Sequence, residues 1–174
     1  MKYCDLSVLF IIKLLTKVGI KNKITFLRKY SIETNSPELF NPKYKINSKK
    51  SDLTKLANHY RTDKGDIKHG YTYIYEQYLY QFRDSKFNML EIGVANGSSI
   101  QMWKDYFPNA SITGLDIEES CSTLFYNEPR VEIFIGDSNS YNFNDKSFQI
   151  ILDDGSHLPS DIIKTFNNLW RNLK

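Results

Sequence analysis

The stretch Glu91-Ile92-Gly93-Val94-Ala95-Asn96-Gly97 decides the fold of this 174-residue chain. An apolar strand is expected over 87–92, and a helix is expected over 98–107, where Pro108 stops it. Glycine lets a backbone turn sharply and approach a ligand closely. In open α/β sheets, ligands bind just beyond the carboxyl ends of the strands. The stretch therefore predicts a ligand-facing turn, and the alternative is a tight strand–helix turn that binds nothing.

The spacing of the glycines separates two classes of ligand. A dinucleotide fingerprint requires G-x-G-x-x-G. Counted from Gly93, the second glycine position holds Ala95 and the third holds Ser98, so this pattern fails twice. The acidic-x-G-x-G-x-G pattern of S-adenosylmethionine enzymes fits from Glu91 with one change, at Ala95. The spacing therefore favours S-adenosyl-L-methionine over NAD.

Strands alternate with helices from residue 87 onwards. Strands are expected at 87–92, 111–117, 131–135 and 148–152, and helices at 98–107, 118–126 and 159–173. Two earlier helices are expected, one capped by Ser51 and one over 71–82. This alternation predicts an α/β fold, a Rossmann-like parallel sheet with helices on both faces.

The first 50 residues differ from the rest, so we expect an N-terminal helical extension with a linker over 1–50 and a domain over 51–174. The apolar run 6–15 is shorter than the ~20 residues that span a bilayer. We interpret it as a helix that packs on the domain or on a partner chain, which includes a homo-oligomer. Membrane-surface contact by residues 6–24 is the alternative, supported by four lysines.

Composition narrows the class of protein. Hydrophobic residues make up 41% and charged residues 25%, which is typical of a globular domain. The net charge of +3 comes from scattered lysines, so no nucleic-acid partner is expected. Cys4 and Cys121 have neither metal-ligand nor disulfide spacing, and a cytoplasmic location is the simplest interpretation.

Acidic residues follow the second and third expected strands. Asp116 ends the second strand about 20 residues after the glycine turn, where a carboxylate can accept both ribose hydroxyls. Asp137 follows the third strand and is expected near the adenine edge. The alternatives without a ligand-binding role are that Asp116 is a solvated residue at the end of a strand and that Asp137 belongs to an ordinary turn.

The fourth strand ends in Asp153-Asp154-Gly155-Ser156-His157. Carboxylate oxygens suit a divalent cation such as Mg²⁺. Histidine side chains ordinarily titrate near neutrality, so His157 could take a proton from a hydroxyl as a general base, although a lone histidine is more often structural.

These motifs resemble class I methyltransferases, and most nearly the metal-dependent sugar O-methyltransferases of the macrocin and mycinamicin group. The turn Thr62-Asp63-Lys64-Gly65, with His69 after it, is similar to the segment that precedes the core in those enzymes. The similarity covers about residues 52–170.

The resemblance implies a role for each motif. S-adenosyl-L-methionine would be the cofactor, Mg²⁺ would be the metal ion, and a small-molecule or glycan hydroxyl would be the acceptor. Asp116 would hold the ribose, Asp137 would approach the adenine, and Asp154 would bind the metal while His157 activates the hydroxyl. The remaining expected cofactor contacts are Glu91, Gly93, Ala95, Gly97 and Asp153.

The chain departs from this family after the fourth strand. Class I methyltransferases add three more strands, and an acidic pair after the fifth completes the metal site. The expectation is therefore a partial domain: a fragment, a degenerate gene product, or a chain completed by a partner. A non-catalytic cofactor-binding or interaction module and an NAD-linked or nucleotide-sugar Rossmann enzyme are the alternative functions.

Overall fold

Four parallel strands form the centre of the fold, in the order β3-β2-β1-β4. The computed structural model describes residues 51–125 and 127–174. The strands are β1 (Asn88–Ile92), β2 (Ser111–Asp116), β3 (Val131–Ile135) and β4 (Ile150–Asp153). Each lies within two residues of the bounds expected from the sequence, so the predicted parallel sheet is confirmed.

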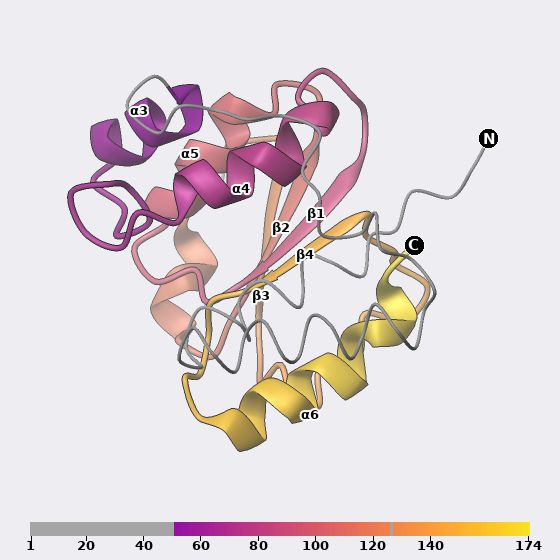
Figure 1. Cartoon of the computed structure of the whole chain (residues 1–174). Helices are drawn as coiled ribbons and strands as arrows, with labels where there is room; N and C mark the ends of the chain where they lie inside the picture. The colour runs from indigo at the N-terminus through magenta and orange to yellow at the C-terminus, as the bar shows by residue number, and fades with distance from the viewer. Residues whose placement is uncertain (1–50, 126) are drawn as a thin grey trace, which may run out of the picture.

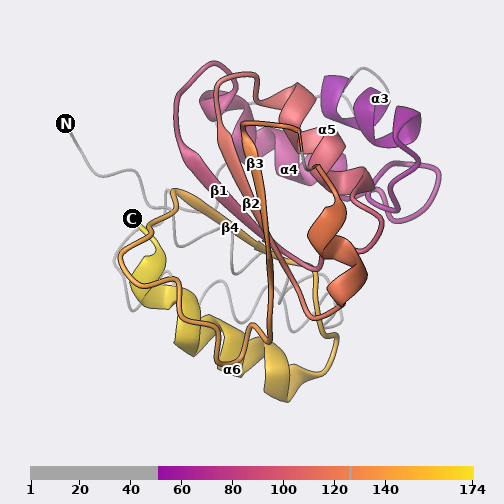
Figure 2. The ribbon, with the colours of Figure 1, turned by 180° about the vertical axis from the view of Figure 1, so that it is seen from behind.

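The sheet is covered on both faces, as Figures 1 and 2 show. Helices α3 (Asp52–His59), α4 (Thr72–Leu79) and α5 (Ser98–Tyr106) lie on one face, and α6 (Pro159–Leu169) lies on the other. Strands covered on both faces carry apolar residues almost continuously, and in β1 only Asn88 is exposed. The Rossmann-like α/β class predicted from the sequence is thus correct.

The layer of α3, α4 and α5 shares one core with the sheet. Leu53, Leu79, Met89 and Trp103 belong to a single buried cluster and are fully inaccessible to solvent. Ser51 caps α3, because its side chain accepts a hydrogen bond of 3.0 Å from the Thr54 N–H. The helices before β1 are therefore integral to the domain.

On the other face of the sheet, the residues after α6 pair with the segment that precedes β4. After α6, a 3₁₀ turn over Trp170–Asn172 leads to a parallel bridge between Leu173 and Phe148. The Phe148 N–H donates to the Asn172 carbonyl at 2.8 Å, and the Lys174 N–H donates to the Phe148 carbonyl at 2.9 Å. The last residues thus lie beside the segment that enters β4, on the side away from β1.

The helix expected over 118–126 is wrong. The structure has a 3₁₀ turn over Glu119–Thr123, after which Leu124 is extended and Phe125 adopts a φ of 63°. Ser, Cys and Thr side chains are weak helix formers that compete for backbone hydrogen bonds. Only Cys121 is buried in this turn, so no apolar stripe draws a longer helix onto the sheet.

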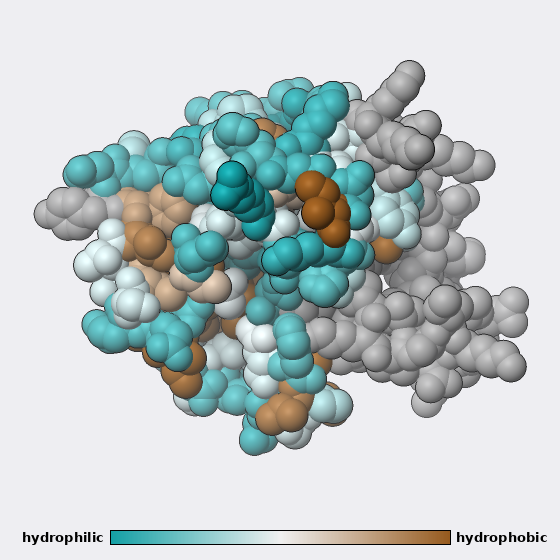
Figure 3. All heavy atoms as spheres, turned by 90° about the vertical axis from the view of Figure 1, so that its left-hand side faces the viewer, coloured by the Kyte–Doolittle hydropathy of each residue, from teal (hydrophilic) through white to brown (hydrophobic). Residues whose placement is uncertain are grey.

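Several expectations fall outside the described residues, namely the helical segment and linker over 1–50, the boundary at residue 50 and the membrane-surface contact of residues 6–24. Within residues 51–125 and 127–174, no helix has the length and apolar character needed to cross a bilayer. The coloured surface in Figure 3 is mostly hydrophilic, with small apolar patches between polar side chains.

Candidate active site

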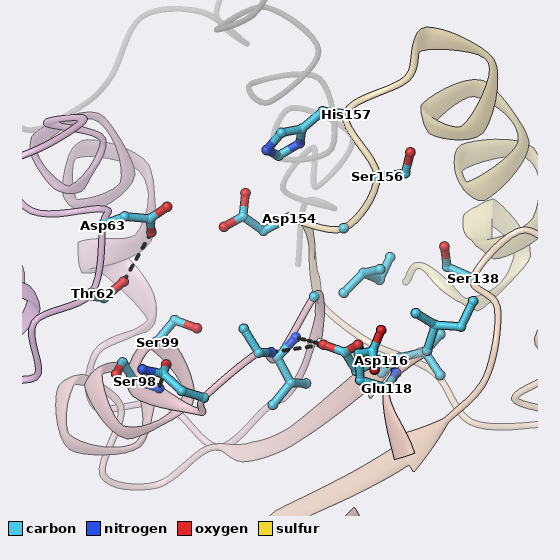
Figure 4. Close-up of a pocket in the computed structure, with 18 of the residues that line it drawn as sticks. Thr62, Asp63, Ser98, Ser99, Asp116, Glu118, Ser138, Asp154, Ser156 and His157 are labelled. Carbon is cyan, nitrogen blue, oxygen red and sulfur yellow. Dashed lines mark hydrogen bonds between the residues drawn. The ribbon is translucent and has the colours of Figure 1, made fainter. Parts of the chain in front are cut away.

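A cavity of about 940 Å³ opens at the carboxyl ends of the four strands. The loops that follow β1, β2, β3 and β4 all contribute to its wall, and the α3–α4 loop closes one side. Figure 4 shows polar side chains from these loops facing the same space. This is the edge at which parallel α/β sheets bind ligands.

Gly93 lets the loops after β1 and β4 pack against each other. Its φ is 86°, and a Cβ at this position would lie 2.3 Å from the carbonyl oxygen of Asp154. Ala95, also on the cavity wall, adopts a positive φ of 50° without being glycine. The turn predicted from the sequence is therefore strained where it borders the cavity.

Most N–H groups of the glycine turn are engaged inside the protein. Asp116 Oδ2 accepts hydrogen bonds from the N–H groups of Val94 at 2.7 Å and Ala95 at 2.9 Å. Further bonds to protein oxygens use the N–H groups of Gly93, Gly97 and Ser98. A phosphate-binding turn instead presents such groups to its ligand. This turn is therefore unsuited to the pyrophosphate of a dinucleotide.

Asp116 joins the glycine turn to the cavity. Besides the two bonds to Oδ2, its Oδ1 accepts a 3.0 Å bond from the Glu118 N–H. Partial burial raises the pKa of Asp116, but the backbone donors of Ala95, Glu118 and Val94 outweigh it and hold the pKa below its ordinary value. A carboxylate oxygen has further lone pairs, so this ionised group can also accept ligand hydroxyls.

Glu91, Gly97 and Asp153, three expected cofactor contacts, lie behind the cavity wall. Glu91 is fully buried and accepts hydrogen bonds from Ser99 Oγ at 2.8 Å and Trp103 Nε1 at 3.2 Å. Gly97 borders a second, shallower pocket, and Asp153 is buried at the end of β4. Any effect of these three residues on a ligand in the main cavity is therefore indirect.

Lys64 is a wall residue that the sequence did not single out. Its side chain is 5% exposed, and its Nζ donates a short hydrogen bond to Asp154 Oδ2. The same Nζ lies 3.5 Å from Asp63 Oδ1 and 3.7 Å from Glu91 Oε1. One ammonium group from the α3–α4 loop thus contacts carboxylates from three separate parts of the chain.

The loop after β4 presents Asp154 and His157. Figure 4 shows the His157 ring and the carboxylates of Asp63 and Asp154 bordering one open space. Ser156 orders this loop, because its Oγ donates to Asp161 Oδ2 at 2.7 Å and accepts from the Leu158 N–H at 3.2 Å. The two residues expected to carry the chemistry therefore share one wall of the cavity.

The loop after β3 brings Asp137 to the same cavity and is attached to α6. Asn168 Nδ2 donates to the carbonyls of Ser138 at 3.0 Å and Tyr141 at 2.8 Å. Next to Asp116, the Ile117 side chain is 70% exposed and lies on the cavity wall. Ile117 was not singled out from the sequence as a residue of the cavity wall, although an apolar residue after the strand-ending acid was a usable signal.

The charge of the cavity wall is negative. The six carboxylates that line it belong to Asp63, Asp116, Glu118, Asp137, Asp154 and Asp161. The three cationic side chains that line it are Arg61, Lys64 and Lys68. A wall of this sign attracts cationic ligands and repels anionic ones.

Comparison with known proteins agrees with this geometry. Residues 89–174 match the family model described as a methyltransferase domain. The chain is 32% identical over 140 residues to a mycinamicin VI 2''-O-methyltransferase from Micromonospora griseorubida, covering 73% of this chain and 34% of the relative. It is 34% identical over 134 residues to an 8-demethyl-8-alpha-L-rhamnosyl tetracenomycin-C 2'-O-methyltransferase from Streptomyces olivaceus, covering 70% and 34%.

A solved structure shows the same arrangement of elements. The MycE methyltransferase of the mycinamycin biosynthetic pathway, in complex with Mg and SAH, aligns with a TM-score of 0.64 at 32% identity. The alignment covers 73% of this chain and 38% of that one. This chain spans about a third of the length of the curated relatives it matches. The glycine turn, the strand order and these similarities together show that the chain has the Rossmann-like fold of class I methyltransferases, with residues 89–174 matching a methyltransferase domain.

Proposed function

We propose that this chain binds S-adenosyl-L-methionine and contributes to transfer of its methyl group to a sugar or glycan hydroxyl. The observation that carries the proposal is the glycine turn, most of whose N–H groups donate to Asp116 and to neighbouring carbonyl oxygens. At such a turn, the Asp116 carboxylate can accept hydrogen bonds from ribose hydroxyls, whereas the engaged N–H groups cannot donate to a phosphate. Because the cavity wall is negatively charged, it also favours a cationic sulfonium cofactor over an anionic dinucleotide.

The cofactor would lie across the loops after β1, β2 and β3. Asp116 would accept the ribose hydroxyls, and Ile117 would cover one face of the adenine, because both lie side by side on the wall. Asp137 would face the edge of the adenine. Gly93 would leave room for the methionine end, since its backbone borders the cavity without a side chain.

Mg²⁺ fits this site through Asp154. No group of three or more metal-ligating side chains gathers in the described part of the chain. Mg²⁺ is commonly held by one or two carboxylates and keeps several waters, so a single carboxylate is a sufficient anchor from these residues. MycE, the similar solved structure, is in complex with Mg, which supports Mg²⁺ as the ion.

His157 would act as the general base. When bound, the cofactor supplies a methyl carbon that a hydroxyl oxygen can attack while the carbon–sulfur bond breaks and its electron pair stays on sulfur. His157 would take the hydroxyl proton as the oxygen attacks, because its ring borders the same space as Asp154. Asp116 and Ile117 would keep the cofactor oriented during this step.

Calorimetric titration with S-adenosylhomocysteine tests the cofactor assignment. We expect the chain to bind it and Asp116→Ala to bind it about 10- to 100-fold more weakly, as for loss of hydrogen bonds to a charged group. Asp145→Ala is the matched control, because Asp145 is exposed and lies away from the cavity wall. No binding, or equal binding of NAD, would refute the proposal.

Turnover tests the role of His157. In the presence of Mg²⁺ and an accepted sugar, His157→Gln should lower the rate of S-adenosylhomocysteine formation by about 10²- to 10⁴-fold, as for loss of a general base. Its affinity for S-adenosylhomocysteine should stay within about twofold, since the residue would act on the acceptor. An unchanged rate would remove His157 from the mechanism. A chain that binds the cofactor and never transfers a methyl group would instead be a binding module.

The acceptor, the cytoplasmic location and homo-oligomerisation stay proposals. The mycinamicin and tetracenomycin relatives are named for sugar-bearing natural products, which supports a small-molecule or glycan acceptor. Peripheral membrane contact by residues 6–24 stays a prediction from the sequence.

A further inference from the structure

Lys64 has no part in the proposed transfer, yet its ammonium group contacts carboxylates of the α3–α4 loop, of β1 and of the loop after β4. It reaches from the α3–α4 loop, 90 residues before Asp154, and is buried at the wall of the cavity. Its contacts are Asp154 just after β4, Glu91 within β1, and Asp63 beside it in the loop. These are the carboxylates of the expected metal ligand, the glycine motif and the cavity rim.

Burial makes this arrangement costly to disturb. An ammonium group and a carboxylate that are both removed from water are stable only while each compensates the other. Glu91 is fully buried, and Asp154 is mostly shielded from solvent. Lys64 is therefore needed to keep two shielded carboxylates side by side.

The same contact sets a limit on cation binding. Lys64 Nζ donates directly to Asp154 Oδ2, which is one of the two oxygens that a divalent cation could use. A divalent cation at Asp154 would also meet a fixed positive charge a few ångströms away, and such repulsion is strong in a poorly solvated site. The Lys64 ammonium group and a divalent cation would therefore compete for the Asp154 carboxylate.

We propose that Lys64 is a positioning residue that holds Asp154 beside Glu91 and competes with the divalent cation for the Asp154 carboxylate. This inference rests on the proposed function in one respect, the role of Asp154 as the metal ligand. It adds that the affinity for the cation is limited by an internal ammonium group. It also adds that the glycine motif and the metal ligand are held together by a residue upstream of both.

Lys64→Met in the full chain is the test, with Mn²⁺ binding followed by electron paramagnetic resonance. Methionine is close to lysine in length and carries no charge, so Mn²⁺ should bind at least about fivefold more tightly once the competing ammonium is gone. Without cation the variant should unfold at a lower temperature than the native chain, and Mn²⁺ should raise that temperature by more than in the native chain. Lys64→Arg keeps the charge and should show no gain in affinity.

Lys68→Met is the matched control, because Lys68 lines the same cavity and loses the same charge. Its affinity for Mn²⁺ should change by less than about twofold, since the structure records no ion pair between Lys68 and Asp154 among the described residues. Equal gains in Lys64→Met and Lys68→Met would reduce the effect to the general charge of the cavity and overturn the inference. Unchanged or weaker binding in Lys64→Met would do the same.

A measurement on the native chain covers the case in which Lys64→Met does not fold. With ¹⁵N-labelled lysine, the Lys64 Nζ resonance should move when Mg²⁺ is added, and the Lys68 resonance should not. A Lys64 resonance that stays in place at saturating Mg²⁺ would overturn the competition. Titration with S-adenosylhomocysteine in the same samples keeps the proposals apart, because cofactor binding can fail while cation competition is observed, and the reverse.

Discussion

At the scale of single residues, Asp116 has the most consequences. Its carboxylate completes the hydrogen bonding of the glycine turn and still faces the cavity. The sequence predicted its place at the end of β2, because an acid after an apolar strand is a local signal. Its second role, as acceptor for the Val94 and Ala95 N–H groups, depends on the exact path of a turn more than 20 residues away.

The lowered pKa of Asp116 predicts how stability depends on pH. A carboxyl whose folded pKa lies below its unfolded value stabilises the fold above the unfolded value, and this contribution is lost as the pH falls through the folded value. The free energy of unfolding should therefore fall as the pH is lowered from about 5 to below the ordinary value of 3.8.

Urea unfolding of the native chain and of Asp116→Asn across this range isolates the effect. The asparagine variant lacks the titrating group, so the stability gap between the two proteins should be largest near neutral pH and should shrink in acid. A gap that is constant with pH would show that Asp116 acts through its shape and not through its charge.

The burial of Lys64 and its contacts with Glu91 and Asp154 could not be predicted from the sequence. The turn Thr62-Asp63-Lys64-Gly65 was visible in the sequence, but nothing local shows that a lysine will be buried. Its partners Glu91 and Asp154 lie 27 and 90 positions later, and only the packed fold brings them together. Buried lysines are rare unless paired, so the location was improbable until the carboxylates around it were seen.

At the scale of elements, the contact between the loops after β1 and β4 shapes the site. Gly93→Ala should destabilise the fold by about 3 kcal/mol or more, because a Cβ would meet the Asp154 carbonyl at 2.3 Å and would also strain a residue with positive φ. Thermal or urea unfolding measures the loss.

Gly70→Ala is the control for this prediction. Gly70 has a φ of 65°, and a Cβ there would meet no atom within 4 Å. The backbone strain alone should cost about 1 kcal/mol. Equal losses in the two variants would mean that the close approach of the loops adds nothing to the strain.

The elements themselves were mostly predictable, for physical reasons that differ between segments. β1 and β4 are short apolar runs bordered by turn residues, and α6 begins at a proline followed by an apolar stripe. The prediction of a helix after β2 was wrong because the acidic start of this segment resembled the first turn of a helix. The residues that followed lacked the apolar spacing that would hold such a helix on the sheet.

At the scale of the whole molecule, the helices before β1 belong to the same cooperative unit as the sheet. Leu53 and Tyr75 from α3 and α4 share a buried cluster with Trp103 of α5 and Met89 of β1. Glu76 strengthens this junction, because its Oε1 accepts hydrogen bonds from the Leu53 N–H and the Tyr106 hydroxyl. We therefore expect α3, α4 and the sheet to unfold together.

Fluorescence and circular dichroism test this expectation. Trp170→Phe leaves Trp103 as the single tryptophan, and Trp103 is fully buried beneath the helices. In urea, its fluorescence change should coincide with the loss of far-ultraviolet dichroism in one transition. A separate, earlier fluorescence transition would mean that α3 and α4 detach while the sheet persists. The unmodified chain is the control for any effect of the substitution.

The buried position of Lys64 has a consequence for how this domain can be recombined. The recognisable methyltransferase segment begins at residue 89, but the ammonium group beside Asp154 is supplied from upstream of that point. A graft of residues 89–174 onto a foreign scaffold would carry Glu91 and Asp154 without their common counter-ion and expose the apolar side of α5. A transplantable unit must therefore extend upstream at least to Ser51, where the helix that leads to Lys64 is capped.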